Sequence, residues 1–98
     1  MIELNKEYII RTLDDEKLWK EGEEDAFKYG EWNITIRKEE KIYFPFTFSI
    51  HGKKDNSCET WSRRYKSMED AFLHIVNGFN ENANIKNKYS TLLDYKIE

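Results

Sequence analysis

Two consecutive stretches of the chain, 32–39 and 41–51, alternate between apolar and polar side chains. Every second position is apolar: Trp32, Ile34 and Ile36 in the first stretch, and Ile42, Phe44, Phe46, Phe48 and Ile50 in the second. A period of two is typical of half-buried antiparallel strands, because successive side chains on a strand point to opposite faces of the sheet. The polar link between the stretches is short, so we expect the two strands to form a hairpin.

A third strand is expected directly after this hairpin. Residues 52–56 form a cluster of turn-favouring types, and the stretch 58–65 then places Trp61 and Tyr65 on one side of a strand. Cys58 is expected to be a small, structural residue of that strand, since a free cysteine mostly behaves as a small hydrophobic residue.

The clearest helix signal spans residues 67–82. Ser67 and Asp70 form a capping-box pattern, in which the hydroxyl accepts from a first-turn amide and the acid returns a hydrogen bond. The apolar residues behind it follow the i, i+3, i+4, i+7 spacing of one helix face: Met68, Ala71, Phe72, Ile75, Val76 and Phe79. Residues 85–93 show a similar spacing and predict a second helix.

The N-terminal segment, 1–31, is expected to be acidic and mostly helical. The apolar residues Leu4, Tyr8, Ile9 and Leu13 suit a helix, although 8–10 also suits a strand. Residues 14–16 can start a second short helix, and 23–29 can add a further turn that ends at Gly30.

These elements predict a single α+β domain of 98 residues. Its three parts are the helical segment 1–31, the strands 32–66 and the helical segment 67–98. The expected architecture is a three-stranded antiparallel β-meander packed against helices, in the order α-β-β-β-α-α. The core is expected to join the Ile/Phe face of the strands to the helix stripe, so Phe46→Ala and Phe72→Ala should each cost about 3–5 kcal/mol.

Catalytic and cofactor signatures are missing from the sequence. The two histidines, His51 and His74, and the single cysteine are too few for a zinc site built from four Cys and His ligands. The four glycines are scattered, which excludes a phosphate-binding loop and a dinucleotide fingerprint, and no nucleophile-elbow motif occurs. We therefore predict a protein that is not an enzyme and needs no metal or cofactor.

The expected location is the cytoplasm. No apolar run approaches the length of a membrane helix, no secretory signal opens the chain, and one cysteine cannot form an internal disulfide.

The net charge of −3 conceals an uneven distribution along the chain. Residues 1–31 carry ten acids and five bases, residues 32–66 carry four acids and eight bases, and residues 67–98 carry five acids and three bases. Each of the first two segments has an ordinary interpretation, as a solvated helix face or as a sheet face protected by cations. Each also has a functional interpretation, in which opposite charge steers a partner onto the surface.

The acidic candidate surface would bind a basic protein, such as a nuclease that itself binds nucleic acid. It consists of Asp14, Asp15, Glu16, Glu21, Glu23, Glu24 and Asp25. The basic candidate surface would bind nucleic acid through phosphate contacts, with nearby aromatic rings for base stacking. It consists of Arg37, Tyr43, Lys53, Lys54, Arg63, Arg64 and Lys66, with Trp61 and Tyr65 as further stacking rings.

Two resemblances bear on this choice. The element order looks like that of double-stranded RNA-binding domains, but Ser67–Asp70 is acidic at the helix start where those domains carry lysines. The segment that runs from Asn33–Arg37 through Phe72–Asn80, about half of the chain, is similar in pattern to one family of anti-CRISPR proteins, the small phage-encoded inhibitors of Cas nucleases. That resemblance implies a stoichiometric, non-catalytic inhibitor, and an antitoxin or immunity protein is a third alternative.

Overall fold

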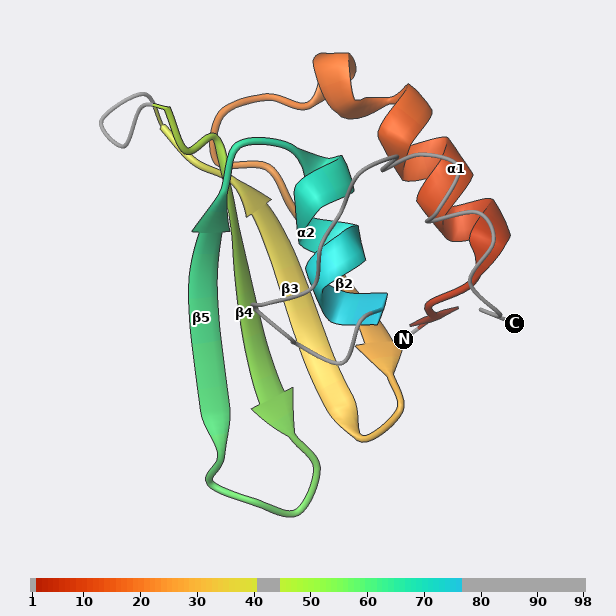
Figure 1. Cartoon of the computed structure of the whole chain (residues 1–98), viewed down its shortest axis with the longest axis vertical. Helices are drawn as coiled ribbons and strands as arrows, with labels where there is room; N and C mark the ends of the chain where they lie inside the picture. The colour runs from red at the N-terminus through yellow and green to blue at the C-terminus, as the bar shows by residue number, and fades with distance from the viewer. Residues whose placement is uncertain (1, 41–44, 77–98) are drawn as a thin grey trace.

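The computed structural model describes residues 2–40 and 45–76, which form a mixed β-sheet with helices on one face (Figure 1). The elements in chain order are strand β1 (Ile2–Glu3), helix α1 (Lys6–Asp14), the 3-10 helix η1 (Glu16–Leu18), strands β2 (Glu24–Tyr29), β3 (Trp32–Lys38), β4 (Phe48–Lys54) and β5 (Thr60–Tyr65), and helix α2 (Met68–Val76). The predicted α+β class is confirmed.

The sheet has five strands in the order β1-β2-β3-β4-β5, which corrects the expected three-stranded meander. Strands β2 to β5 pair antiparallel with their neighbours, and the short β1 pairs parallel with β2. Strands β3, β4 and β5 are the predicted meander, and β1 and β2 extend it on one side. The N-terminal third is therefore not entirely helical.

Strand β2 replaces the helical turn expected at 23–29. Only Phe27 of this strand is fully buried, and two acidic residues, Glu24 and Asp25, open it. Gly30 does not end a helix. Its φ of 59° lets residues 30 and 31 form the two-residue turn that brings Tyr29 opposite Trp32.

Strand β4 is shifted toward the C-terminus relative to its prediction. Phe48 and Ile50 are buried as expected, but Phe46 precedes the strand and is exposed. The expected core residues Ile42 and Phe44 lie outside the described residues. Gly52 was expected in a turn, and it lies instead inside the strand.

The turn between β4 and β5 occupies residues 55–58 rather than 52–56. Asn56 adopts a positive φ of 56° there, which asparagine tolerates better than most residues. Cys58 is exposed in this turn, so its predicted place on a strand is wrong.

Helix α1 resolves the ambiguity at residues 8–10 in favour of a helix. The Asn5 side chain caps it by accepting from the Tyr8 amide at 2.8 Å. Tyr8, Ile9 and Thr12 are buried on the side that faces the sheet, as expected for an amphipathic helix.

Helix α2 confirms, over its described part, the helix that the sequence predicts at 67–82. The Asp70 amide donates to the Ser67 hydroxyl, which provides the predicted N-cap. Phe79 and the helix expected at 85–93 lie outside the described residues.

The hydrophobic core contains predicted residues together with others that were not predicted as core. It includes Leu4, Tyr8, Ile9, Trp19, Phe27, Ile34, Ile36, Phe48, Ile50, Tyr65, Met68, Ala71, Phe72, Leu73, Ile75 and Val76.

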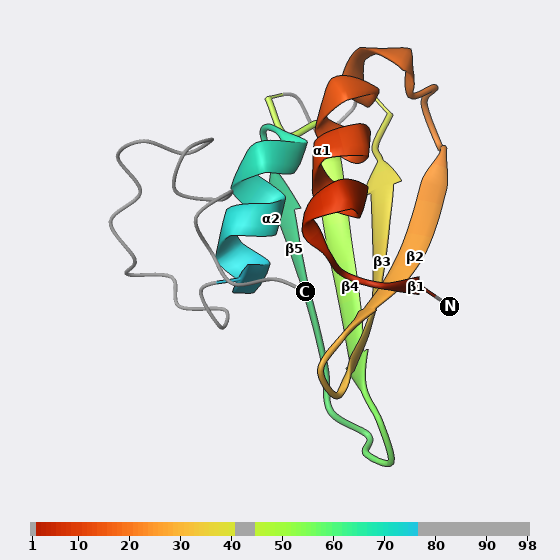
Figure 2. The same cartoon turned by 90° about the vertical axis from the view of Figure 1, so that its right-hand side faces the viewer.

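Both α-helices lie on the same side of the sheet (Figures 1 and 2). Within the described residues no helix covers the opposite side, which we call the open face. Strand alternation and the pairing register assign it Glu24, Ala26, Lys28, Asn33, Thr35, Arg37, Ser49, His51, Lys53, Thr60, Ser62 and Arg64. No helix in the described part of the chain is long and apolar enough to cross a membrane.

Candidate functional site

The seven acidic candidates do not form one continuous surface. Two of them hold the fold together. The Glu16 carboxylate accepts from the Met68 amide at 2.8 Å and so links η1 to α2, and the Asp25 carboxylate accepts from the Tyr8 hydroxyl at 2.8 Å. Glu24 lies on the open face, away from the helices.

The remaining acids lie at two places. Glu21 and Glu23 belong to the turn before β2, where the Glu23 carboxylate accepts from the Lys20 amide at 3.3 Å. Asp14 is the last residue of α1 and Asp15 is its C-cap. Of the seven, only Asp14 and Asp15 lie on the outer side of α1.

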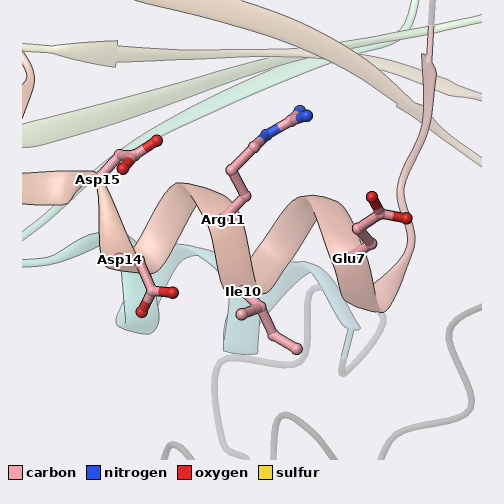
Figure 3. Close-up of a pocket in the computed structure, with 5 residues that line it drawn as sticks. All are labelled: Glu7, Ile10, Arg11, Asp14 and Asp15. Atoms are coloured by element: carbon pink, nitrogen blue, oxygen red, sulfur yellow. The ribbon is translucent and has the colours of Figure 1, made fainter.

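Helix α1 presents a solvent-facing stripe that combines acidic and apolar groups, which we call the α1 outer surface. It is a shallow concavity of about 530 Å³ lined by Glu7, Ile10, Arg11, Asp14 and Asp15 (Figure 3). Figure 3 shows Ile10 and Asp14, one helical turn apart, leaving the helix on the same side. Ile10 is 37% exposed, so it offers aliphatic carbon at the centre of this surface.

Two further features belong to this end of the molecule. The Arg11 guanidinium lies 5.5 Å from the centre of the Tyr8 ring, so its charge is held against an aromatic group of the same helix. Leu18, in the 3-10 turn that follows, is 74% exposed. Three carboxylates, one guanidinium and exposed aliphatic carbon give a surface suited to a basic protein that also offers apolar contacts.

Glu7 and Ile10 are not among the residues predicted from the sequence, because the acidic candidates were those clustered along the chain at 14–25. The signal was present as helical spacing, since 7, 10, 11 and 14 follow i, i+3, i+4 and i+7. Recognising it required knowing that α1 is a helix and which of its faces is buried.

Burial of the Tyr8 phenol, together with its hydrogen bond to Asp25, makes the stability of the fold depend on high pH. Burial, followed by the hydrogen bond to Asp25, raises the pKa of the Tyr8 phenol above its ordinary value of 10.0. Above that pH the unfolded chain loses the phenol proton while the folded chain keeps it, so the free energy of unfolding falls as the pH rises. The loss amounts to at most about 1.4 kcal/mol per pH unit.

Urea unfolding of the wild type and of Tyr8→Phe between pH 9 and pH 11.5 tests this linkage. At pH 9 the variant should be less stable by about 1 kcal/mol, the ordinary value of a lost hydrogen bond. The difference should shrink above pH 10, because the variant has no phenol to ionise. Parallel stability curves over the whole range would contradict the assignment.

The basic candidates are divided between the two sides of the sheet. Arg37, Lys53 and Arg64 lie on the open face, whereas Lys54 and Arg63 lie on the helix-facing side, where the Lys54 amine is 3.7 Å from the Glu59 carboxylate. Lys66 follows β5, and Tyr43 lies outside the described residues.

The cations of the open face are accompanied by carboxylates. Lys28 and Asp55 form an ion pair at 2.6 Å, which lowers the pKa of the Asp55 carboxyl and raises the pKa of Lys28. Ser49 donates to Glu39 at 2.5 Å, and Glu24 pairs in register with Arg37. The face is therefore of mixed charge.

The predicted stacking rings lie on the opposite side of the sheet from these cations. Trp61 and Tyr65 face the helices, and Trp61 packs edge-on against Trp32 with ring centres 6.4 Å apart. The Tyr65 hydroxyl is hydrogen-bonded to Nδ1 of the buried His74. His74 is thus buried, and the Trp61 and Tyr65 rings both pack against it on the helix-facing side.

Two smaller concavities flank β5. One, of about 330 Å³, is lined by Trp32, Glu59, Thr60, Trp61, Ser62, Arg63 and His74, and we call it the indole pocket. The other, of about 270 Å³, is lined by Glu39, Ser49, Ser62, Arg63 and Arg64, and we call it the arginine pocket. Ser62 and Arg63 line both.

The described residues contain no group of three or more His, Cys, Asp or Glu side chains arranged to hold a metal ion. Comparisons with protein-family models, with curated proteins and with solved structures found no match to this chain. Its function must be inferred from its own surface chemistry.

Proposed function

We propose that this protein is a non-enzymatic, protein-binding inhibitor of the anti-defence type, similar in action to anti-CRISPR proteins. The α1 outer surface is the proposed contact, and the partner is a basic, nucleic-acid-binding protein such as a Cas nuclease. The observation that carries the proposal is the exposed Ile10 bordered by the carboxylates of Glu7, Asp14 and Asp15.

Charge and apolar contact have separate roles in this arrangement. Carboxylates at the rim of an interface attract a cationic partner over several ångströms and raise the association rate. Desolvated apolar groups at its centre supply most of the affinity once the surfaces meet. Ile10 at 37% exposure and Leu18 at 74% are the described residues that offer such groups at this end of the molecule.

The mixed charge of the open face gives the alternative, a nucleic-acid-binding module, less support. Cations at Arg37, Lys53 and Arg64 are interspersed with the carboxylates of Glu24 and Glu39. Phosphate binding relies on cations that displace condensed counterions, and neighbouring carboxylates oppose this effect.

Reversing the charge at Asp14 and Asp15 tests the proposed contact. We expect the double variant D14K/D15K to bind a Cas nuclease about tenfold more weakly than the wild type, because attraction becomes repulsion at the rim. Binding is measured by biolayer interferometry, and inhibition is measured by the cleavage of a DNA target. The effect should decrease with added salt, since exposed charges are screened.

The matched control is E21K/E24K, which makes the same change in net charge at acids outside the α1 outer surface. It should bind the nuclease as the wild type does. Equal losses for both double variants would show that only net charge matters and would overturn the assigned contact.

Two further assays test the alternative functions. Binding of a nuclease toxin in the same assay tests the antitoxin or immunity role. A gel shift of RNA or DNA by the protein at low salt would favour the nucleic-acid alternative.

A further inference from the structure

Helix α1 carries two exposed carboxylates seven residues apart on its outer side. Glu7, in the first turn, and Asp14, the last residue, both line the α1 outer surface (Figure 3). A rise of about 1.5 Å per residue places their backbone positions about 10.5 Å apart, and a rotation of about 100° per residue returns them to almost the same side of the helix. A partner that pairs with both carboxylates must therefore offer two cations at this separation.

The acids at the carboxyl end of α1 are not explained by helix stability. Acidic residues stabilise the first turn of a helix, where Glu69 and Asp70 lie in α2, because the amino end carries partial positive charge. Asp14 and Asp15 lie at the opposite end of α1, where a negative charge is unfavourable. Within residues 2–40 and 45–76, neither these carboxylates nor that of Glu7 forms an ion pair. A cation supplied by a partner would relieve this unfavourable placement.

Midway along α1, an apolar and a cationic side chain lie between the two carboxylates. Ile10 is exposed, and Figure 3 shows it leaving the helix on the opposite side from Arg11. The α1 outer surface thus presents the series acidic, apolar, basic, acidic at positions 7, 10, 11 and 14. The complementary series is basic, apolar, acidic, basic.

We propose that the α1 outer surface binds an antiparallel helix of the basic partner, which carries this complementary series at positions i, i+3, i+4 and i+7. The inference rests on the proposed function, because it describes the element of the partner that meets the same contact. The first cation of the helix faces Asp14 and the second faces Glu7. Between them, the apolar residue faces Ile10 and the acidic residue faces Arg11.

A helix fits this surface better than an extended strand does. Residues seven apart on any helix lie on one side and are separated by about 10.5 Å, so the spacing of the partner matches that of α1. Side chains on one face of a strand are two or four residues apart, which is about 7 or 13 Å, and neither distance matches. The antiparallel direction also brings the amino end of the partner helix, with its partial positive charge, to Asp14 and Asp15.

A second copy of this chain is a poor occupant of the α1 outer surface. In an antiparallel pair of α1 helices, Glu7 would face Asp14 and Arg11 would face Arg11. In a parallel pair, Glu7 would face Glu7. Like charges meet in both arrangements and oppose association.

The test titrates the full chain with a capped peptide of about fifteen residues, held helical by a cross-link on its far side because isolated helices of this length are marginal. Its contact side carries lysine, leucine, glutamate and lysine at i, i+3, i+4 and i+7, and alanine and glutamine fill the other positions. Affinity is measured by calorimetry and the contact by amide chemical shifts. We expect saturable binding at submillimolar peptide, with shift changes concentrated at residues 7–15.

The matched control peptide has the same composition but carries its second lysine at i+11. This lysine stays on the contact side of the helix but lies too far from the first to reach Glu7 while the first faces Asp14. It should bind at least about tenfold more weakly than the first peptide.

Two variants of the protein test the apolar contact. Ile10→Ser should weaken binding of the first peptide about tenfold, because it removes the exposed aliphatic group from the contact. The matched control is Ile2→Ser, which removes a similarly exposed isoleucine from β1, outside the α1 outer surface. It should bind the peptide as the wild type does.

Exchange of charges tests the pairing and the direction of the helix together. Glu7→Lys should weaken binding about tenfold. A peptide with glutamate in place of its second lysine should restore binding to this variant, because that position faces residue 7 in the antiparallel arrangement. A peptide with glutamate in place of its first lysine should not restore it.

Three results would overturn the proposal: no binding of the first peptide at millimolar concentration, equal affinity for the two lysine spacings, or restoration of Glu7→Lys binding by exchange of the first lysine. The nuclease assay is read separately. If D14K/D15K loses the nuclease but the wild type does not bind the peptide, the proposed function stands and the helix contact fails. If the peptide binds as expected but D14K/D15K keeps its full affinity for the nuclease, the helix contact stands and the proposed function fails.

Discussion

Phe72→Ala should lower the free energy of unfolding by about 3–5 kcal/mol. Phe72 is 0% exposed and lies where α2, α1 and the sheet meet. Its ring centre is 6.2 Å from that of Tyr8 on α1 and 5.9 Å from that of Phe27 on β2. Truncation removes the transfer free energy of the ring and leaves a cavity bounded by three elements that cannot all close on it.

The matched control for this prediction is Phe46→Ala, which removes the same ring from a side chain that is 40% exposed. The alternation at 41–51 predicted an equal effect at both positions. With Phe46 ahead of β4 and partly in solvent, the expected cost falls to about 1 kcal/mol or less. Urea unfolding of both variants decides between the two expectations, and equal losses would mean that Phe46 is part of the core.

Gly52→Val should destabilise the protein by about 1–3 kcal/mol, although valine is a better strand residue than glycine. A Cβ atom at position 52 would lie 2.9 Å from Nε1 of Trp61 and 3.4 Å from a ring carbon of Trp32. Both indoles lie over this glycine, so the strand has room for them only because position 52 has no side chain.

A double-mutant cycle with Trp61→Leu isolates this contact. If the indole is the obstacle, Gly52→Val should cost much less in the Trp61→Leu background, and the difference is the coupling energy between the two positions. Lys53→Val, on the open face of the same strand, is the control for strand propensity and should be close to neutral. If Gly52→Val costs the same in both backgrounds, the destabilisation comes from the backbone at position 52 and not from the contact with Trp61.

The periodic patterns predicted the elements whose burial is regular. Ile34 and Ile36 on β3, Phe48 and Ile50 on β4, and the capped stripe of α2 all occupy the expected positions, because each element buries one face and the period of its apolar residues records this. Composition and the absence of catalytic motifs also led directly to the prediction of a binding protein.

Strand β2 shows where that reasoning stops. Half of its six residues are charged, and Phe27 alone is fully buried. What makes it a strand is the partner on each side: β3 pairs with it along its whole length, and β1 pairs with it at Phe27 and Lys28. Backbone hydrogen bonds to neighbouring strands do not depend on side-chain type. They therefore produce no periodic pattern of apolar residues in the sequence of the strand.

The candidate sites divide in the same way. The sequence by itself determined that the chain has an acidic first third and a basic middle, because charge is a property of the residues. Only the tertiary structure decided which charges share a surface. It uses Glu16 and Asp25 as acceptors of hydrogen bonds from other elements of the fold, places Arg37 and Arg63 on opposite faces of one sheet, and leaves Asp14 and Asp15 beside an exposed Ile10. The physical reason is that side chains alternate between the two faces of a strand and are rotated by about 100° per residue around a helix, so sequence neighbours point in different directions. The packing of the core then decides which of these faces meets solvent.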